Sequence, residues 1–273
     1  MLRLRMVLLA FFPFVGSMAC YGQNIERIEF TTDRGETVQA MLATPPGTGR
    51  HPAVIYSHGT IVRLSGYEGA KAQGMDVADF VRALATEGYV AIAPIRDFLS
   101  GSAIMQRGRP AGDPSAWAEV VERGIRTVNG AAAYLSGLSN VDAVRIAAMG
   151  FSEGGNVTLW SAMDNPRFRG IVLLAPAALS DLKYSLRDAS QEHRLSTVSA
   201  PVFLAVGADD SEPIRQPLTR LFIPNMEKLG KATFRYRTDY PGGHTWFYRV
   251  REPYWRDVTA FLKDVMNPTF GTR

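Results

Sequence analysis

The sequence predicts an α/β fold, in which a mostly parallel β-sheet carries helices on both faces and begins with an antiparallel hairpin. One observation is that short apolar runs alternate with amphipathic stretches from Ile25 onward, as expected for strands joined by crossover helices. Another is the pentapeptide Gly150-Phe151-Ser152-Glu153-Gly154, which stands between an apolar run and a helical stretch. This context is typical of a serine on a sharp strand-to-helix turn.

The predicted strands are short runs rich in apolar and β-branched residues, and turn residues bound them. The first two form a hairpin, because the turn sequence Asp33-Arg34-Gly35 separates them. The loop Thr44-Pro45-Pro46-Gly47 precedes the third strand, and Pro94 closes the fourth. In chain order, the predicted strands are residues 25–31, 37–43, 53–56, 89–93, 144–149, 170–174, 202–206 and 233–238.

The predicted helices occupy the stretches between these strands. Residues 75–86 place their apolar side chains on one face and end before Gly88, which is a helix-stop signal. Residues 177–200 are too few for a lid domain, so we expect a short cap segment, one helix and its connections, above the site. The other predicted helices are residues 115–138, 215–229 and 253–265, and a further helix opens at Asn156.

Ser152 is the candidate nucleophile. A strand-to-helix turn would hold it in strained backbone geometry, with its hydroxyl clear of the sheet. Gly150 and Gly154 remove side chains that would collide with the neighbouring strand and helix. The alternative is an ordinary Gly/Ser turn, because G-x-S-x-G by itself is a weak signal. The surrounding strand and helix, and the partner residues described below, favour a catalytic role for Ser152.

Four histidines could supply the base that such a serine needs. His51 precedes a proline in a polar stretch and His193 lies in a charged segment, so both are expected at the surface. His58 ends an apolar run and precedes a glycine, which suggests a role in a loop. His244 follows the last predicted strand in a turn-rich loop, from which it can reach the carboxyl edge of the sheet. His244 is therefore the candidate base.

The third member should be an acid that orients the imidazole and stabilises its charged form. The strand over residues 202–206 is followed by Gly207-Ala208-Asp209-Asp210, which places two carboxylates at its end. Either Asp209 or Asp210 could serve, and the other would then cap the loop.

These motifs resemble those of the α/β-hydrolase superfamily, close to its dienelactone-hydrolase-like and prolyl-oligopeptidase-like groups, from about residue 25 to the end of the chain. In that superfamily the triad follows the order serine, acid, histidine, and the acid commonly stands three residues after the glycine that ends its strand. The resemblance thus favours Asp210, with Asp209 as the alternative. Dienelactone hydrolases carry a cysteine nucleophile where Ser152 stands, so the resemblance implies a fold and a hydrolytic mechanism more than a lactone substrate. The motifs that carry it are Ser57-His58-Gly59, Gly150-Phe151-Ser152-Glu153-Gly154-Gly155, Gly207-Ala208-Asp209-Asp210 and Pro241-Gly242-Gly243-His244.

The resemblance also implies two backbone donors for the oxyanion of an acyl-transfer reaction. The N–H of Glu153, directly after the serine, is one of them. The other comes from the loop after the third strand, where Thr60 is favoured and Ile61 is the alternative. His58 would brace this loop and take no part in proton transfer. The side chain of Glu153 is interpreted as a favourable partner for the helix dipole.

Composition bounds the remaining function classes. A 273-residue chain that is 46% apolar suits a single α/β domain, here residues 20–273. The 30 basic and 26 acidic residues leave only a small positive charge, and nothing in the sequence suggests the clustered basic face that nucleic-acid binding would need. The usual zinc spacings, the phosphate loop and the dinucleotide fingerprint are all absent from the sequence, so neither a cofactor nor a metal is predicted.

Residues 1–19 resemble a secretory signal peptide, with a basic start, an apolar run over residues 6–15 and small residues at Ser17 and Ala19. The apolar run is too short to span a membrane. Cleavage after Ala19 would leave Cys20, the single cysteine of the chain, at the mature N-terminus. The sequence therefore predicts export, either by ordinary secretion or with a membrane tether through a lipidated Cys20.

The sequence thus predicts a serine hydrolase that cleaves a carboxylic ester, or a related acyl bond, of a small molecule through an acyl-enzyme. The alternatives are a peptidase of prolyl-oligopeptidase type and a catalytically silent hydrolase fold used for binding, although the complete set of serine, acid and histidine argues against the silent fold. Several apolar and basic residues could line the pocket, but for each taken singly core packing or a solvated position is the simpler interpretation. They are Arg96, Phe98, Leu99, Met105, Arg107, Arg109, Trp117, Trp246 and Phe247.

Overall fold

The computed structural model describes residues 24–96, 114–177, 193–230 and 233–267. Within them, one eight-stranded sheet has the strand order β1-β2-β4-β3-β5-β6-β7-β8. The pairs β1–β2 and β2–β4 are antiparallel, and every later pair is parallel. The strands are β1 (Ile25–Thr31), β2 (Thr37–Ala43), β3 (His51–Ser57), β4 (Val90–Pro94), β5 (Val141–Phe151), β6 (Ile171–Leu174), β7 (Val202–Gly207) and β8 (Phe234–Tyr240).

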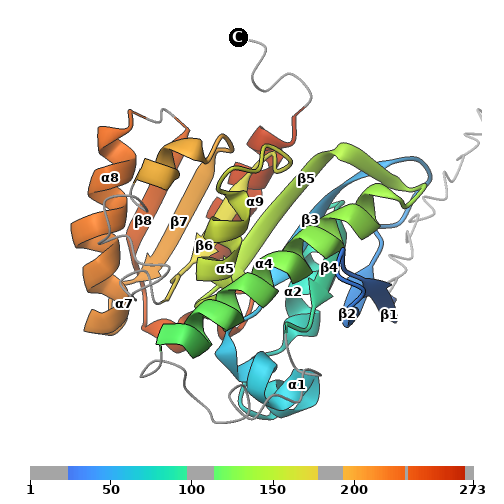
Figure 1. Ribbon diagram of the computed structural model, residues 1–273, viewed down its shortest axis with the longest axis horizontal. Helices are drawn as coiled ribbons and strands as arrows, with labels where there is room; N and C mark the ends of the chain where they lie inside the picture. The colour runs from blue at the N-terminus through green and yellow to red at the C-terminus, as the bar shows by residue number, and fades with distance from the viewer. Residues whose placement is uncertain (1–23, 97–113, 178–192, 231–232, 268–273) are drawn as a thin grey trace, which may run out of the picture.

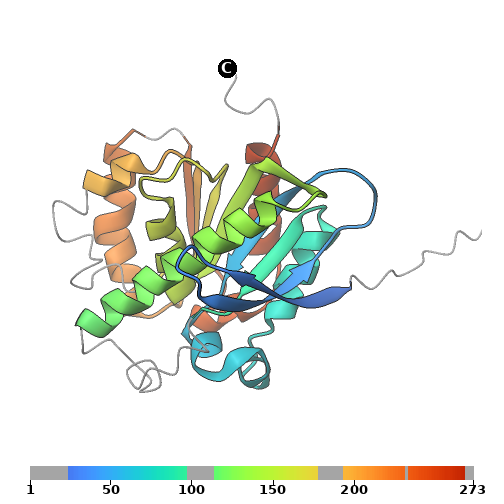
Figure 2. The same ribbon diagram turned by 45° about the vertical axis from the view of Figure 1, so that its right-hand side comes forward.

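Helices cover both faces of this sheet, which confirms the predicted α/β fold (Figure 1). Figure 2 shows the β1–β2 hairpin at the end of the sheet opposite α8. The longer helices are α1 (Thr60–Ala72), α2 (Val77–Thr86), α4 (Pro114–Ser136), α5 (Glu153–Ala162) and α9 (Tyr254–Val265). The shorter ones are η2 (Leu195–Thr197), α7 (Glu212–Pro217), η3 (Leu218–Phe222), α8 (Ile223–Lys228) and η4 (His244–Tyr248).

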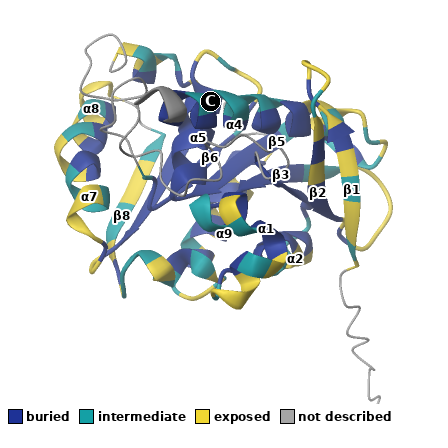
Figure 3. Ribbon diagram, turned by 60° about the horizontal axis from the view of Figure 1, so that its bottom comes forward, coloured by how far each residue is buried: buried dark blue, intermediate teal, exposed yellow. Residues whose placement is uncertain are grey.

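Two apolar cores lie on the two faces of the sheet, and the alternation of side chains along each strand separates them. In β3, Ala53 and Ile55 point into one core while Val54 and Tyr56 point into the other. The first core packs against α4, α5 and α8, and the second against α1, α2 and α9. In Figure 3 the buried sheet accordingly runs between α4 and α5 on one side and α1, α2 and α9 on the other.

The structure differs from the sequence prediction in two helical segments. The sequence pattern predicts no element over Thr60–Ala72, where the structure has helix α1. Gly66 inside this helix has a φ of 69°, so a kink interrupts its helical turns. The single helix predicted over residues 215–229 is α7, a π-helical turn η3 and α8. Pro217 and Pro224 lie in this segment, and each lacks the N–H that an uninterrupted α-helix would use.

The predicted cap segment falls mainly on residues 178–192, and the predicted signal peptide on residues 1–19, both outside the described residues. Of the cap, the described part contains two helical residues, 193–194, followed by the 3₁₀ turn η2. No helix among the described residues is long and apolar enough to cross a bilayer.

Strand β5 offers a matched pair of substitutions, because burial changes sharply along it. Ile146 is fully buried in the first core, whereas Val144 is 74% exposed. We expect Ile146→Ala to lower the free energy of unfolding by about 2–5 kcal/mol, through lost burial and the cavity left behind. Val144→Ala should change it by less than about 0.5 kcal/mol. Urea unfolding of both variants measures the difference, and equal losses would contradict the assigned burial.

Candidate active site

Ser152 stands on the tight turn between β5 and α5, in a backbone conformation that residues other than glycine rarely adopt. Its φ is 56° and its ψ is −121°. The Ser152 N–H donates to the carbonyl oxygen of Leu174 at 2.9 Å, and its carbonyl oxygen accepts from Ala177 at 2.9 Å and from Asn156 at 3.1 Å. Neighbouring segments therefore hold the strained residue in place.

Two glycines allow the packing around this turn. A Cβ on Gly154, in the first turn of α5, would collide with the carbonyl oxygen of Ser57 at the end of β3. A Cβ on Gly150, in β5, would collide with the carbonyl oxygen of Gly154. The helix therefore approaches the strand more closely than any side chain would permit.

Ser152, His244 and Asp210 form a continuous hydrogen-bonded chain. The Oγ of Ser152 lies 2.8 Å from Nε2 of His244, and Nδ1 of His244 lies 3.0 Å from Oδ2 of Asp210. The Asp210 side chain is fully buried, whereas that of His244 is 27% exposed. Because Nδ1–H of His244 donates a hydrogen bond to the carboxylate, Nε2 carries no proton and can accept a hydrogen bond from the hydroxyl of Ser152.

The loops that carry Asp210 and His244 are tied to each other by their backbones. The Asp209 N–H donates to the carbonyl oxygen of Gly242 at 3.1 Å, and the Ala208 N–H donates to that of Tyr240 at 2.7 Å. The Asp209 side chain is exposed. The structure thus brings Asp210, and not Asp209, into contact with His244.

The imidazole also packs against the residue that precedes the serine. The ring of Phe151 lies 4.8 Å from that of His244 and 5.6 Å from that of Tyr248, which approaches it edge-on. Because these three residues come from β5 and η4, ring packing fixes the histidine loop against the strand that delivers Ser152.

Two helix N-termini converge next to the serine. Glu153 is the first residue of α5 and Thr60 the first of α1, and the N–H groups in the first turn of a helix have no intrahelical acceptor. A Cβ on Gly59, directly before Thr60, would lie 3.5 Å from Cβ of Ser152. Both backbone donors expected from the sequence therefore lie in segments that adjoin Ser152. Ile61, the alternative, is the second residue of α1.

The side chain of Glu153 has a role that the sequence analysis missed. It is almost fully buried and forms ion pairs with Arg63 at 3.0 Å and with Arg96 at 2.9 Å. Burial alone would raise the pKa of this carboxyl, but the two guanidinium groups outweigh burial, and the pKa lies below its usual value. Arg96, interpreted from sequence as solvated or as a substrate ligand, is 1% exposed and bound to Glu153.

His58 braces the loop after β3, as the sequence suggested. Its Nε2 accepts the N–H of Arg96 at 3.0 Å, so its proton resides on Nδ1, which lies 2.9 Å from the carbonyl oxygen of Gly59. Burial and the charge of Arg96 hold the pKa of His58 well below its usual 6.5. His58 is therefore neutral in the folded protein.

The other residues weighed from sequence lie elsewhere. His51 begins β3 and is half-buried, His193 is exposed, and Trp117 and Phe247 belong to the two apolar cores. Phe98, Leu99, Met105, Arg107 and Arg109 lie outside the described residues.

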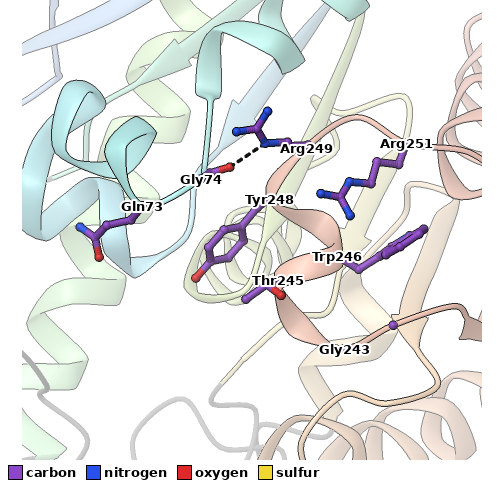
Figure 4. A pocket seen from close by; sticks show the side chains of 9 residues that line it. Gln73, Gly74, Gly243, Thr245, Trp246, Tyr248, Arg249 and Arg251 are labelled. Carbon is purple, nitrogen blue, oxygen red and sulfur yellow. Dashed lines mark hydrogen bonds between the residues drawn. The ribbon is translucent and has the colours of Figure 1, made fainter.

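A pocket of about 330 Å³ lies beside the histidine loop (Figure 4). Gly243 and Thr245, which flank His244, line it together with Trp246 and Tyr248. The guanidinium carbon of Arg251 lies 4.9 Å from the Trp246 ring centre, a cation–π distance. The pocket thus offers aromatic and cationic walls next to the candidate base. Among the described residues, no group of three or more His, Cys, Asp or Glu could hold a metal ion.

Comparison with known proteins identifies the family of this chain. The model of the dienelactone hydrolase family matches residues 38–263. The chain belongs to the dienelactone hydrolase family. Membership of this family makes it a hydrolase acting on ester bonds. A search of curated proteins found no match to the sequence.

Solved structures similar to this family member share the α/β-hydrolase fold. The esterase Est22 is 20% identical, with a TM-score of 0.62 over 89% of this chain and 81% of that one. A dienelactone-hydrolase-like promiscuous phosphotriesterase from metagenomic libraries is 15% identical, with a TM-score of 0.64 over 89% and 99% of the two chains. An acylaminoacyl peptidase from Pyrococcus horikoshii is 15% identical, with a TM-score of 0.63, and the match spans 89% of this chain but 42% of the peptidase.

The neutral state of His58 leads to a pH dependence of stability. Below pH 6.5 the His58 side chain takes up a proton in the unfolded chain but not in the folded protein. Its contribution to the free energy of unfolding is therefore complete above pH 6.5 and declines as the pH falls below that value. The decline is at most about 1.4 kcal/mol per pH unit. We expect His58→Gln to remove this component when urea unfolding is compared at pH 8, 6.5 and 5. Parallel curves for the two proteins would contradict it.

Proposed function

We propose that this chain is a serine hydrolase that cleaves carboxylic esters through an acyl-enzyme. The observation that carries the proposal is the chain of hydrogen bonds from Ser152 through His244 to Asp210. An unassisted serine hydroxyl is a poor nucleophile at neutral pH, and a positioned imidazole removes its proton as the new bond forms. Asp210 orients the ring and stabilises its positive charge in that step.

In the acylation step, Oγ of Ser152 forms a bond to the carbonyl carbon of the ester while its proton moves to Nε2 of His244. The carbonyl electrons move onto oxygen and give a tetrahedral oxyanion. When this intermediate collapses, the carbon–oxygen bond to the leaving group breaks, and Nε2 delivers its proton to the departing alcohol. The acyl group remains on Ser152.

In the deacylation step, water replaces the alcohol. His244 takes a proton from the water as its oxygen attacks the acyl carbon, and it then returns that proton to Oγ of Ser152. The carboxylic acid leaves and the free serine is restored. In both steps the backbone N–H groups of Glu153 and Thr60 would hold the oxyanion, since each stands at the start of a helix beside Ser152.

Ester and peptide substrates differ in the leaving group that His244 must protonate. Membership of the dienelactone hydrolase family supports an ester, whereas the likeness to acylaminoacyl peptidase supports only a shared fold. A panel of p-nitrophenyl esters and peptide p-nitroanilides separates the two candidates. Hydrolysis of the anilides in preference to the esters would assign a peptidase, and inertness towards both would favour a binding role.

The nucleophile is tested by Ser152→Ala. We expect this variant to fold, to lose covalent labelling by a fluorophosphonate probe, and to lose at least about 10⁴-fold in ester turnover. His244→Ala should be nearly as severe, because the base is then missing. Persistent labelling of the Ser152→Ala protein would place the nucleophile at another residue.

Asp209 supplies a matched control for the acid. Asp210→Asn should reduce kcat by about 10⁴-fold, because an amide stabilises neither the required tautomer nor the charged imidazole. Asp209→Asn should retain activity close to that of the unmodified protein, since its side chain is exposed. The reverse ranking in steady-state assays would reassign the role to Asp209.

We also propose that the protein is exported and tethered to a membrane through Cys20, because this single cysteine directly follows the signal-like segment. Two acyl chains suffice for stable anchoring, at about 0.8 kcal/mol per buried CH₂. Cys20→Ser should then move the protein from the membrane fraction to the soluble fraction without altering its specific activity. An unmodified protein that is already soluble, with a mature mass lacking lipid, would instead indicate ordinary secretion.

A further inference from the structure

The two candidate oxyanion donors are linked through their own side chains. Oγ1 of Thr60 donates to Oε2 of Glu153 at 3.0 Å, although 93 residues separate them in sequence. The N–H groups of the same two residues would bind the oxyanion. This hydrogen bond therefore connects the start of α1 to the start of α5 directly behind the site.

Two arginines from different elements hold the Glu153 carboxylate in a fixed orientation. Arg63, in α1, places Nε 3.0 Å from Oε1 and Nη2 3.0 Å from Oε2, which is the bidentate geometry. Arg96, which follows β4, places Nη2 2.9 Å from Oε1. All three side chains are 1% exposed.

Arg96 extends the linkage to the loop between β3 and α1. Its Nη1 donates to Oγ of Ser57 at 2.8 Å, and its N–H donates to Nε2 of His58 at 3.0 Å. The segment from Ser57 to Arg63 is thus attached to Glu153 both before and after Thr60. Displacement of Thr60 relative to Glu153 would require breaking charge-assisted hydrogen bonds among the buried side chains of Arg63, Arg96 and Glu153.

Stability alone is a weak reason for such a cluster, because removing charges from water can cost as much free energy as pairing them returns. Apolar side chains of the same volume would fill this space as well. What they would not supply is directional bonding between two helix N-termini. A shift of about 1 Å in a reacting group can cost about 10²-fold in rate.

We propose that the side chains of Glu153, Arg63 and Arg96 are positioning residues that set the distance between the N–H groups of Thr60 and Glu153. They do so from behind the site and contact no reacting atom. This inference rests on the proposed serine-hydrolase function, since it assigns a task to residues around the same oxyanion.

The central test is Glu153→Gln, which preserves shape but removes the charge that both arginines bind. We expect kcat for a p-nitrophenyl ester to fall at least about tenfold with KM within about twofold, because only the transition state uses the oxyanion donors. The rate of fluorophosphonate labelling should fall in parallel, because the phosphonyl oxygen gains negative charge as Ser152 attacks phosphorus and displaces fluoride, and that oxygen uses the same donors.

A thionoester supplies a readout that loss of stability would not change. Sulfur is larger than oxygen and accepts hydrogen bonds poorly, so well-placed donors favour the oxygen ester. Glu153→Gln should therefore slow hydrolysis of the ester more than hydrolysis of the matching thionoester, so the ester-to-thionoester rate ratio should fall.

Arg63 is tested by two substitutions. Arg63→Lys keeps the charge but loses the bidentate fork, and it should recover part of the rate that is lost in Arg63→Met.

Ser161→Ala is the matched control, because Ser161 lies in the same helix α5 and is buried. Among the described residues, its hydroxyl donates a single hydrogen bond, to the carbonyl oxygen of Val157 at 2.7 Å. It should leave kcat and the ester-to-thionoester ratio unchanged. If Glu153→Gln does not fold, Thr60→Val tests the same link, because it removes Oγ1 while keeping the backbone N–H.

The outcomes distinguish this inference from the function on which it rests. Active wild-type protein with an unchanged ratio and labelling rate in Glu153→Gln, or in Thr60→Val where Glu153→Gln does not fold, overturns the positioning role and leaves the hydrolase standing. Wild-type protein that neither reacts with the probe nor cleaves an ester overturns the proposed function, and the positioning role with it.

Discussion

The arrangement at the candidate site depends on how closely α5 packs against the end of β3. Gly154 leaves no room for a Cβ against the Ser57 carbonyl, so the helix start and the strand end are in backbone contact. This contact brings the N–H of Glu153 and the loop before α1 to the same side of Ser152. A bulkier residue would separate the two helix N-termini, and the turn at Ser152 would lose the support that keeps it strained.

The opposite side of the site is built from the ends of β7 and β8. Backbone hydrogen bonds join the loops that carry Asp210 and His244, so the distance between acid and base is set by main-chain atoms rather than by flexible side chains. Phe151 then packs the imidazole against the strand that carries the serine. The ends of β5, β7 and β8 are thereby joined around Ser152, His244 and Asp210, as the proposed reaction requires if its rate depends on alignment.

The strands and the triad arrangement could be predicted from sequence because their signals are local. Apolar runs with flanking turn residues predicted every strand of the sheet. The residues after β7 left both Asp209 and Asp210 open, and the resemblance to the α/β-hydrolase superfamily favoured Asp210, which contacts His244. Helix α1 was not predicted, because the kink at Gly66 interrupts the helical spacing of its apolar residues. The ion pairs of Glu153 were not predicted either. Arg63 lies 90 residues and Arg96 57 residues from Glu153 in the sequence, and no local pattern predicts such a contact. From its sequence position alone, Arg96 was interpreted as a solvated surface residue.

The positive φ of Ser152 has a consequence for how this protein can change over time. Such a conformation costs a non-glycine residue on the order of 1–3 kcal/mol, and glycine would adopt it with little strain. A chain optimised for stability alone would therefore replace the serine. Because the total free energy of unfolding of a typical domain is only about 5–15 kcal/mol, the cost of this one strained backbone conformation is a measurable fraction of it. Under the proposed function, folding stability and nucleophilic reactivity therefore favour different residues at position 152.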